Sequence, residues 1–345
     1  MLSKLLKLLS VTLLVLLLAA VAAGSVIYRD FVATPLNIDE PGLTYDVASG
    51  QTLKMIAQDL QQRGVLSHAV YLVGLSYLRD GKHSVRAGEY ILRPGTTPPQ
   101  LLEQLALGKV TDHVLTLVEG WTFRQVLDAV ARHEKLEHTL KSLSDSEIMA
   151  RLGFSGQHPE GRFYPDTYHF PKGTRDVDFL KRAYRAMQQH LQAAWETRSA
   201  DLPFNTADEA LILASIVEKE TGLASERPLI AGVFVRRMRL GMALQTDPTV
   251  IYGMGESFDG NLRRSDLTTD TPYNTYTRNG LPPTPIAMPG LDAIRAVLHP
   301  ASGDALFFVA RGDGGHVFSA TLAEHNRAVY QYQINAAARK KVVQE

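Results

Sequence analysis

The pattern of apolar and polar positions separates an uncharged N-terminal run from a longer, periodic remainder. No charged side chain occurs from Leu8 to Tyr28, and a helix of this length measures roughly 31 Å, about the thickness of the hydrocarbon layer of a bilayer. Lys4 and Lys7 precede the run, so we expect residues 1–30 to hold a short cytoplasmic tail and a single-pass anchor in the cell inner membrane. A cleaved signal peptide is the alternative, because the stretch AVAAGS offers small residues. Both interpretations place the remaining chain outside the cytoplasm.

A small mixed unit is predicted over residues 43–109, after a polar linker at 31–42. Its pattern begins with the alternating stretch LTYDV and continues through two helical repeats. The strand-like GEYIL and the helix TPPQLLEQLALGK, with prolines in its first turn, complete the unit. This β-α-α-β-α order resembles a LysM-like module, a peptidoglycan-binding fold. The resemblance implies that the lobe contacts glycan, and a spacer domain without a ligand is the alternative.

A larger mixed domain is predicted over residues 110–335, followed by a tail at 336–345. Helical periodicity covers a long segment near 177–197 and another near 207–220, whereas the later chain is rich in Gly, Pro, Tyr, Asn and Thr. Two apolar strands, ALFFVA and HVFSAT, flank the turn RGDGG. The predicted fold class is therefore α+β, and we expect a groove along the C-terminal end of the 207–220 helix.

Composition removes several classes of function from consideration. The 345 residues carry a formal net charge of +0 and no cysteine, which argues against a basic nucleic-acid surface and excludes thiol nucleophiles and disulfides. The segment RHEKLEH lacks the H-E-x-x-H spacing of a zinc site, and neither a phosphate-binding loop nor a G-x-S-x-G elbow occurs. We therefore expect no metal, no cofactor and no nucleic-acid partner. Structural roles are expected for His299, His316 and His325.

The segment LILASIVEKETG ends an apolar helical pattern with two acids. Thr206 and Glu209 match a capping box at the start of this helix, and Thr221 and Gly222 mark its end. The apolar positions cover most directions around the helix axis, so this helix is predicted to be buried. One narrow polar stripe is predicted at helical spacing, formed by Asp208, Ser215 and Lys219.

Glu218 and Glu220 both continue apolar faces of this helix. Burial raises the pKa of a carboxyl group, and the partial negative charge at a helix C-terminus acts in the same direction. A carboxyl that stays protonated near neutral pH can act as a general acid. The alternative is that these acids reach water or pair with Arg236 or Arg237.

Several segments together carry a resemblance to a known family. The stretches EGRFYPDTYHFPKGT, LQTDPTVIYG, TPYNTYTRNGLPPTPIAMPG and LHPASGDALFFVARGDGGHVFSATLAEHN, with ASIVEKETG, resemble the endolytic murein transglycosylase family (MltG, YceG-like). The resemblance implies a lyase that cuts the β-1,4 bond between N-acetylmuramic acid and N-acetylglucosamine inside glycan strands. It implies 1,6-anhydro-muramyl ends, a limit on nascent strand length, and Glu218 as the catalytic residue.

Polar and aromatic clusters in these segments are candidates for holding the sugar, because saccharide sites pair aromatic faces with amide and carboxylate groups. The alternative is turn chemistry, since Asp-Pro and Asn-rich stretches form turns unaided. Glu220 is a candidate either for assisting Glu218 or for a structural role. The candidate substrate-binding residues are Glu220, Tyr164, Asp166, Tyr168, Gln245, Thr246, Asp247, Tyr273, Asn274 and Tyr276.

Two other functions stay open at this point. A muramidase-type hydrolase on the same bond would need a second carboxylate near Glu218, for which Glu220, Asp166 and Asp247 are available. A non-catalytic scaffold would bind peptidoglycan without cutting it. The expected partners are peptidoglycan glycan strands and the inner membrane, and the family resemblance adds penicillin-binding peptidoglycan synthases.

Overall fold

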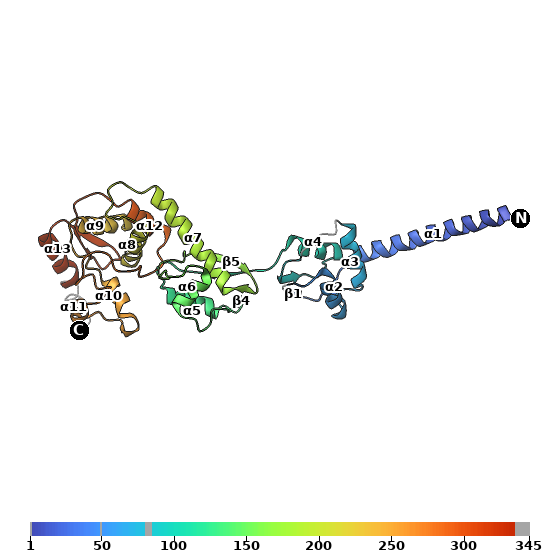
Figure 1. Cartoon of the computed structure of the whole chain (residues 1–345), viewed down its shortest axis with the longest axis horizontal. Coiled ribbons are helices and arrows are strands. Elements are labelled where there is room, and N and C mark those ends of the chain that lie inside the picture. The colour runs from blue at the N-terminus through green and yellow to red at the C-terminus, as the bar shows by residue number, and fades with distance from the viewer. Residues whose placement is uncertain (1, 49, 80–84, 335–345) are drawn as a thin grey trace. The chain divides into compact units, whose positions relative to one another are not determined.

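The computed structural model describes residues 2–48, 50–79 and 85–334, and the chain divides into two units (Figure 1). Unit 1 comprises residues 1–113 and 169–173, and unit 2 comprises residues 114–168 and 174–345. Helices alternate with short two-stranded sheets, so the predicted mixed α+β class is confirmed. The predicted tail at 336–345 lies outside the described residues.

A long apolar helix opens unit 1. Helix α1 spans Leu2–Ala33, and its part Leu8–Ala33 is long and apolar enough to cross a membrane, with a mean hydropathy of 2.5. A membrane anchor and a signal sequence share these properties. The helix runs into the predicted linker at 31–42, where Phe31 is buried and the N–H of Leu36 donates to the carbonyl of Thr96 at 2.8 Å. This segment is therefore packed against the body of unit 1.

The body of unit 1 has the predicted β-α-α-β-α order. The two strands pair antiparallel, with Leu43 opposite Leu92. Thr52 accepts a hydrogen bond from the N–H of Met55 and so fixes the start of the first helix. Apolar side chains from every element form one core. The elements are β1 (Leu43–Val47), α2 (Leu53–Gln62), α3 (Ala69–Leu78), β2 (Gly88–Leu92) and α4 (Pro98–Leu107).

The chain passes between the two units within strands β3 and β5, which pair with each other. Strand β4 pairs in parallel with β6. A capping box at Thr122 begins α5, and a second at Ser144 begins α6. The elements are β3 (Asp112–Thr116), α5 (Phe123–Arg132), β4 (Leu136–Glu137), α6 (Asp145–Leu152), β5 (Thr167–Pro171), β6 (Thr174–Arg175) and α7 (Asp176–Glu196).

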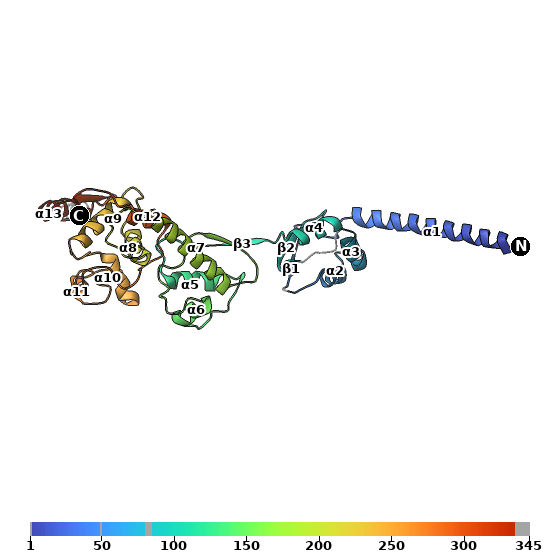
Figure 2. The same ribbon diagram turned by 45° about the horizontal axis from the view of Figure 1, so that its top comes forward.

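The core of unit 2 is built around α8 (Ala207–Glu220). This helix packs against α7, α9 and α12 (Figure 2). The predicted ribbon near the C-terminus is confirmed as an antiparallel hairpin of β7 and β8. The remaining elements are α9 (Arg227–Arg239), α10 (Asp247–Met254), η1 (Gly255–Ser257), α11 (Arg264–Thr268), α12 (Leu291–Leu298), β7 (Phe307–Ala310), β8 (His316–Ser319), α13 (Leu322–Val329) and η2 (Tyr330–Ile334).

Candidate active site

The start and end of α8 follow the sequence signals, with one correction. The hydroxyl of Thr206 accepts from the N–H of Glu209 at 3.2 Å, and the Glu209 carboxylate accepts from the N–H of Thr206 at 3.3 Å. The helix ends at Glu220 as predicted, but Thr221 caps it with an extended backbone, and Gly222 does not take the left-handed conformation of a glycine cap. The chain therefore turns away directly after Glu220.

The predicted polar stripe along α8 is wrong at its centre. Ser215 is fully buried; its hydroxyl donates to the carbonyl of Ile212 at 2.7 Å and accepts from the N–H of Ile286 at 2.9 Å. Only the ends of the stripe reach polar surroundings, through the Asp208 ion pair with Arg162 and the exposed Lys219. Ser215 thus holds the loop before α12 against the helix, which fixes the loop that ends at Gly290.

Glu218 forms a buried ion pair with Arg227, beside two more exposed acids. Its side chain is 6% exposed; one carboxylate oxygen accepts from Arg227 at 3.2 Å and the other from the N–H of Gly290 at 3.0 Å. Arg227 also lies 3.7 Å from Glu119 and 3.6 Å from Asp292. Burial raises the pKa of Glu218, although the Gly290 N–H and the Arg227 guanidinium oppose the shift. Both oxygens of this carboxylate are therefore engaged by the protein itself.

The Glu218 cluster can form because the backbone at Gly290 lies very close to the Glu119 carboxylate. A Cβ atom on Gly290 would lie 1.9 Å from a carboxylate oxygen of Glu119, so a side chain there would displace Glu119 from Arg227. The partner of Glu218 is Arg227, and not Arg236 or Arg237, which the alternative interpretation of the sequence names. Arg236 instead donates to the carbonyls of Ala301 and Ala305.

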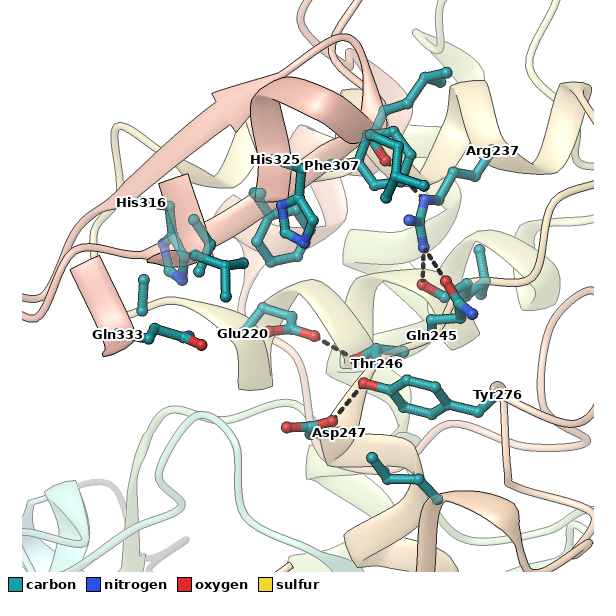
Figure 3. Close-up of a pocket in the computed structure, with 18 residues that line it drawn as sticks. Glu220, Arg237, Gln245, Thr246, Asp247, Tyr276, Phe307, His316, His325 and Gln333 are labelled. Carbon is teal, nitrogen blue, oxygen red and sulfur yellow. Dashed lines mark hydrogen bonds between the residues drawn. The ribbon is translucent and has the colours of Figure 1, made fainter. Parts of the chain in front are cut away.

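Glu220 lines a pocket of about 500 Å³ at the C-terminal end of α8, where the groove was expected (Figure 3). Burial raises the pKa of its carboxyl to about 7, although a hydrogen bond from the hydroxyl of Thr246 opposes the shift. The charge of Asp247 raises this pKa further, and His316 lowers it. A pocket of this size falls in the range of small-ligand sites.

One wall of the pocket is formed by the sequence-predicted segment 245–247 and by Tyr276. The hydroxyl of Tyr276 donates to Asp247 at 2.6 Å. The buried Asn274 orders this wall, because its amide donates to three carbonyls of α11 and the residue after it, and its oxygen accepts from the N–H of Tyr276 at 2.9 Å. Gln245 takes a φ of 55°, a rare conformation for a side-chain-bearing residue. Asn274 is thus a support for the pocket wall.

The opposite wall comes from the C-terminal hairpin and α13, which the sequence did not indicate. Figure 3 shows His316 and His325 on the opposite side of the pocket from Glu220, with Phe307 between His325 and Arg237. The Nδ1 of His316 lies 2.7 Å from the carboxylate of Glu226, whose other oxygen accepts from the N–H of His316 at 2.9 Å. Two of the histidines expected to be structural therefore line the candidate site, whereas His299 contacts Ser199 at 3.2 Å.

Arg237, which the sequence suggested only as an alternative partner of the two acids, is a further pocket residue. Its guanidinium is buried and donates to the carbonyls of Leu306 and Leu244, each at 2.7 Å. It also lies over the ring of Phe307, at 5.1 Å from the centroid. Burial lowers the pKa of Arg237. The side chain therefore ties α9 to both walls of the pocket.

Four other predicted substrate-binding residues lie outside this pocket. Tyr164 stacks on His190 with ring centroids 4.1 Å apart. The buried Tyr168 donates to the carbonyl of Tyr164 at 2.7 Å, and Asp166 accepts from the N–H of Thr167 at 2.7 Å. Tyr273 packs against the core and contacts the hydroxyl of Thr284 at 2.9 Å. A role of these four residues in substrate binding stays a prediction.

A raised carboxyl pKa alone does not identify the site. Burial also raises the pKa of Glu160 to about 7. Its carboxylate accepts from the N–H of Phe123 and from the hydroxyl of Tyr252, both at 3.0 Å, and it does not line the pocket. Among the described residues no group of three or more His, Asp or Glu side chains is placed to hold a metal ion. Glu220 combines a raised pKa with access to a pocket.

Comparisons of the sequence and of the fold with known proteins point to the same family. A sequence model described as the YceG-like family matches residues 45–331. The chain is 31% identical over 335 residues to a Bacillus subtilis protein named endolytic murein transglycosylase, covering 90% of this chain and 91% of that protein. A Streptococcus pneumoniae protein of the same name is 28% identical over 362 residues, and the chain spans 64% of its length. A crystal structure of a YceG-like protein from Listeria monocytogenes is 29% identical with a TM-score of 0.52, covering 84% of this chain and 99% of that chain.

Proposed function

Because the chain belongs to the YceG-like family, we propose that it is a peptidoglycan lytic transglycosylase that cuts inside glycan strands. The bond is the β-1,4 linkage from N-acetylmuramic acid to N-acetylglucosamine, and the product end is 1,6-anhydro-N-acetylmuramic acid. By cutting new strands internally the enzyme limits their length. The names of the relatives from Bacillus subtilis and Streptococcus pneumoniae support the substrate and the reaction class.

The observation that carries the mechanism is the placement of Glu220 in the pocket with a pKa of about 7. Near neutral pH such a group exchanges between its acid and its carboxylate form, as a residue that donates and then accepts a proton requires. Burial and the charge of Asp247 favour the acid, whereas the Thr246 hydrogen bond favours the carboxylate. We therefore assign the proton transfers to Glu220.

The reaction needs one enzyme carboxyl because the nucleophile belongs to the substrate. Protonated Glu220 donates its proton to the glycosidic oxygen as the bond from that oxygen to C1 breaks. The carboxylate then accepts the proton of the muramyl 6-hydroxyl, whose oxygen forms the new bond to C1. The products are a free 4-hydroxyl on N-acetylglucosamine and the anhydro sugar, and Glu220 is protonated again. Holding the 6-hydroxyl near C1 makes the displacement intramolecular.

Glu218, the candidate from the sequence, is the competing assignment. Its carboxylate is engaged by Arg227 and Gly290 and does not line the pocket. In this proposal Glu218 fixes the last turn of α8, so that Glu220 keeps its direction into the pocket. Gln245, Asp247 and Tyr276 provide the polar and aromatic groups that hold the sugar, since they share the pocket with Glu220.

The rest of the chain supports a location of this site at the cell wall. In the proposal α1 is a retained anchor in the cytoplasmic membrane, with the N-terminus inside and unit 2 outside. The β-α-α-β-α body of unit 1 acts as a LysM-like module that contacts glycan. Proximity to membrane-bound penicillin-binding synthases would give the enzyme access to new strands.

Product analysis tests the reaction. Purified full-length chain is incubated with uncrosslinked glycan strands, and the ends are identified by mass spectrometry. Anhydro ends on fragments of intermediate length are expected. Reducing ends that contain an added water would indicate a hydrolase in which Asp247 assists Glu220. Binding of strands without any new ends would indicate a scaffold. Either of these results would overturn the lyase assignment.

A further inference from the structure

The three helices in the body of unit 1 expose different surfaces. The exposed positions of α2 are mostly polar, whereas those of α4 mix Gln100 and Glu103 with Ala106 and Leu107. On α3 the exposed side chains are apolar or aromatic, and Val70 is 78% exposed while Tyr77 and Leu78 are each 74% exposed. No charged residue occurs within α3. A contiguous apolar face on a secreted domain marks an interaction surface.

The exposed residues of α3 form one face of the helix. At about 100° per residue they fall within a sector of roughly 120°, opposite the buried Leu72, Leu75 and Ser76. The glycine in this sector has no atom within 4 Å of a Cβ placed on it, so the face is open. We name this surface the α3 face; it consists of Val70, Tyr71, Gly74, Tyr77 and Leu78.

The α3 face adjoins the end of α1. The ring of Phe31, in the last turn of α1, meets the ring of Tyr71 edge-on with centroids 5.5 Å apart. Phe31 is 7% exposed and belongs to the core of unit 1. The backbone bonds of Leu36 to Thr96 and of Asn37 to Val65, at 2.8 and 2.9 Å, fix the chain directly after α1. Both views of the structure place α3 beside the end of α1 (Figure 1, Figure 2).

Helix geometry sets the depth of this junction. The uncharged run ends at Tyr28, so Phe31 lies about 4.5 Å further along the axis at 1.5 Å per residue. The headgroup layer of one leaflet is roughly 5–7 Å thick, so Phe31 and the adjoining Tyr71 fall within it when α1 spans the bilayer. Tyrosine is enriched at this depth, because its ring is apolar and its hydroxyl is polar.

We propose that the α3 face is a membrane-binding surface that inserts into the headgroup region of the bilayer beside α1. The inference rests on the part of the proposed function in which α1 is a retained anchor. Two contacts with the membrane, one spanning and one interfacial, would fix the orientation of unit 1 at the lipid surface instead of leaving it to pivot on a single helix.

Site-specific labels test this proposal, because the chain has no cysteine and each variant then carries one thiol. The full-length variants Val70→Cys and Leu78→Cys are labelled with an environment-sensitive fluorophore in nanodiscs of phosphatidylcholine and phosphatidylglycerol. Ile91→Cys is the matched control: it is 49% exposed on β2, which lies at the other end of unit 1 from α1 (Figure 2). Nitroxide lipids with the quencher near the headgroup should quench the α3 labels roughly twofold or more above the control.

A label at Leu16→Cys tests the membrane anchor separately from the α3 face. Strong quenching there by a nitroxide deep in the acyl chains, with α3 labels no more quenched than Ile91→Cys, would overturn the α3 face and leave the anchor intact. Unquenched Leu16→Cys would overturn both the anchor and the α3 face. The catalytic assignment is untouched by either result, because no label lies in unit 2.

Discussion

Glu218 and Glu220 leave the same last turn of α8 toward two different regions. Glu218 enters a cluster in which a guanidinium and a backbone N–H occupy its oxygens. Glu220 enters a pocket, where its contact is the neutral hydroxyl of Thr246 and a second carboxylate lies nearby. Burial raises the pKa of both, but only Glu218 has a buried cation as partner. In the proposal, burial therefore gives a structural ion pair in one region and a proton donor in the other.

Replacing each acid by its amide should separate the two roles most strongly. Glu220→Gln cannot donate a proton, so the rate of strand cleavage should fall by about 10²–10⁴-fold, the usual contribution of a general acid. Glu218→Gln keeps an oxygen for the N–H of Gly290 but loses the one that accepts from Arg227, so it weakens the support of the last turn without removing the proposed proton donor, and the rate should fall much less than in Glu220→Gln. Anhydro ends released per minute by equal amounts of folded protein give the comparison. The reverse order of the two variants would return the catalytic role to Glu218.

Changes in the Glu218 cluster should affect the stability of unit 2. Arg227→Met leaves Glu218 buried without its cation, which should lower the free energy of unfolding of unit 2 by about 2–4 kcal/mol. Both tryptophans, Trp121 and Trp195, belong to unit 2, so their fluorescence during denaturant titration follows this unit. The double variant Glu218→Gln with Arg227→Met should lose less than the sum of the single losses, because the two side chains interact.

An exposed ion pair provides the control for that experiment. Arg278 contacts Asp270 at 2.8 Å, and both side chains are more than half exposed. Water screens such a pair, so Arg278→Met should cause a much smaller loss than Arg227→Met. Equal losses would mean that burial of the Glu218 cluster contributes nothing specific to the stability of unit 2.

Glu160 is a third buried acid to compare with Glu218 and Glu220, and it lies outside the pocket. Its pKa of about 7 in the folded chain exceeds the ordinary value of 4.5, so the folded state binds more protons than the unfolded state between these values. The stability that comes from protonated Glu160 is present below pH 4.5 and lost as the pH rises through 7, on the order of 2 kcal/mol. In Glu160→Gln this loss should disappear. Denaturant titrations at pH 5 and 8 measure it, and an unchanged pH dependence would contradict the assignment.

Local signals explain what the sequence predicted well. The boundaries of α8 depend on Thr206, Glu209 and the turn after Glu220, and all of these lie within or beside the helix. The hairpin of β7 and β8 is equally local, because an apolar strand, a glycine-rich turn and a second strand follow one another. In both cases the residues that decide the structure are near neighbours in the chain.

Which of the two glutamates faces this pocket could not be predicted from the neighbouring sequence. They point about 200° apart on the helix, and periodicity does not say which direction holds the pocket. That depends on the hairpin and α13, which come much later in the chain and bring His316 opposite Glu220. Ser215 shows the same limit, because its place on a polar stripe is overridden by the N–H of Ile286. Tertiary partners, not helix geometry, assign these side chains.

The finest test of the comparison concerns the groups that set the pKa of Glu220. The Thr246 hydroxyl stabilises the carboxylate of Glu220, so Thr246→Val should raise the pKa of Glu220. The cleavage rate is expected to fall as the pH rises through about 7, and in Thr246→Val this fall should move upward by about 0.5–1 pH unit. Asp247 disfavours the carboxylate, so Asp247→Asn should move the fall downward. Glu218→Gln should leave it in place, because Glu218 is not among the groups that shift this pKa. A fall in rate that moves with Glu218→Gln instead of with the two pocket variants would show that the titrating acid is Glu218.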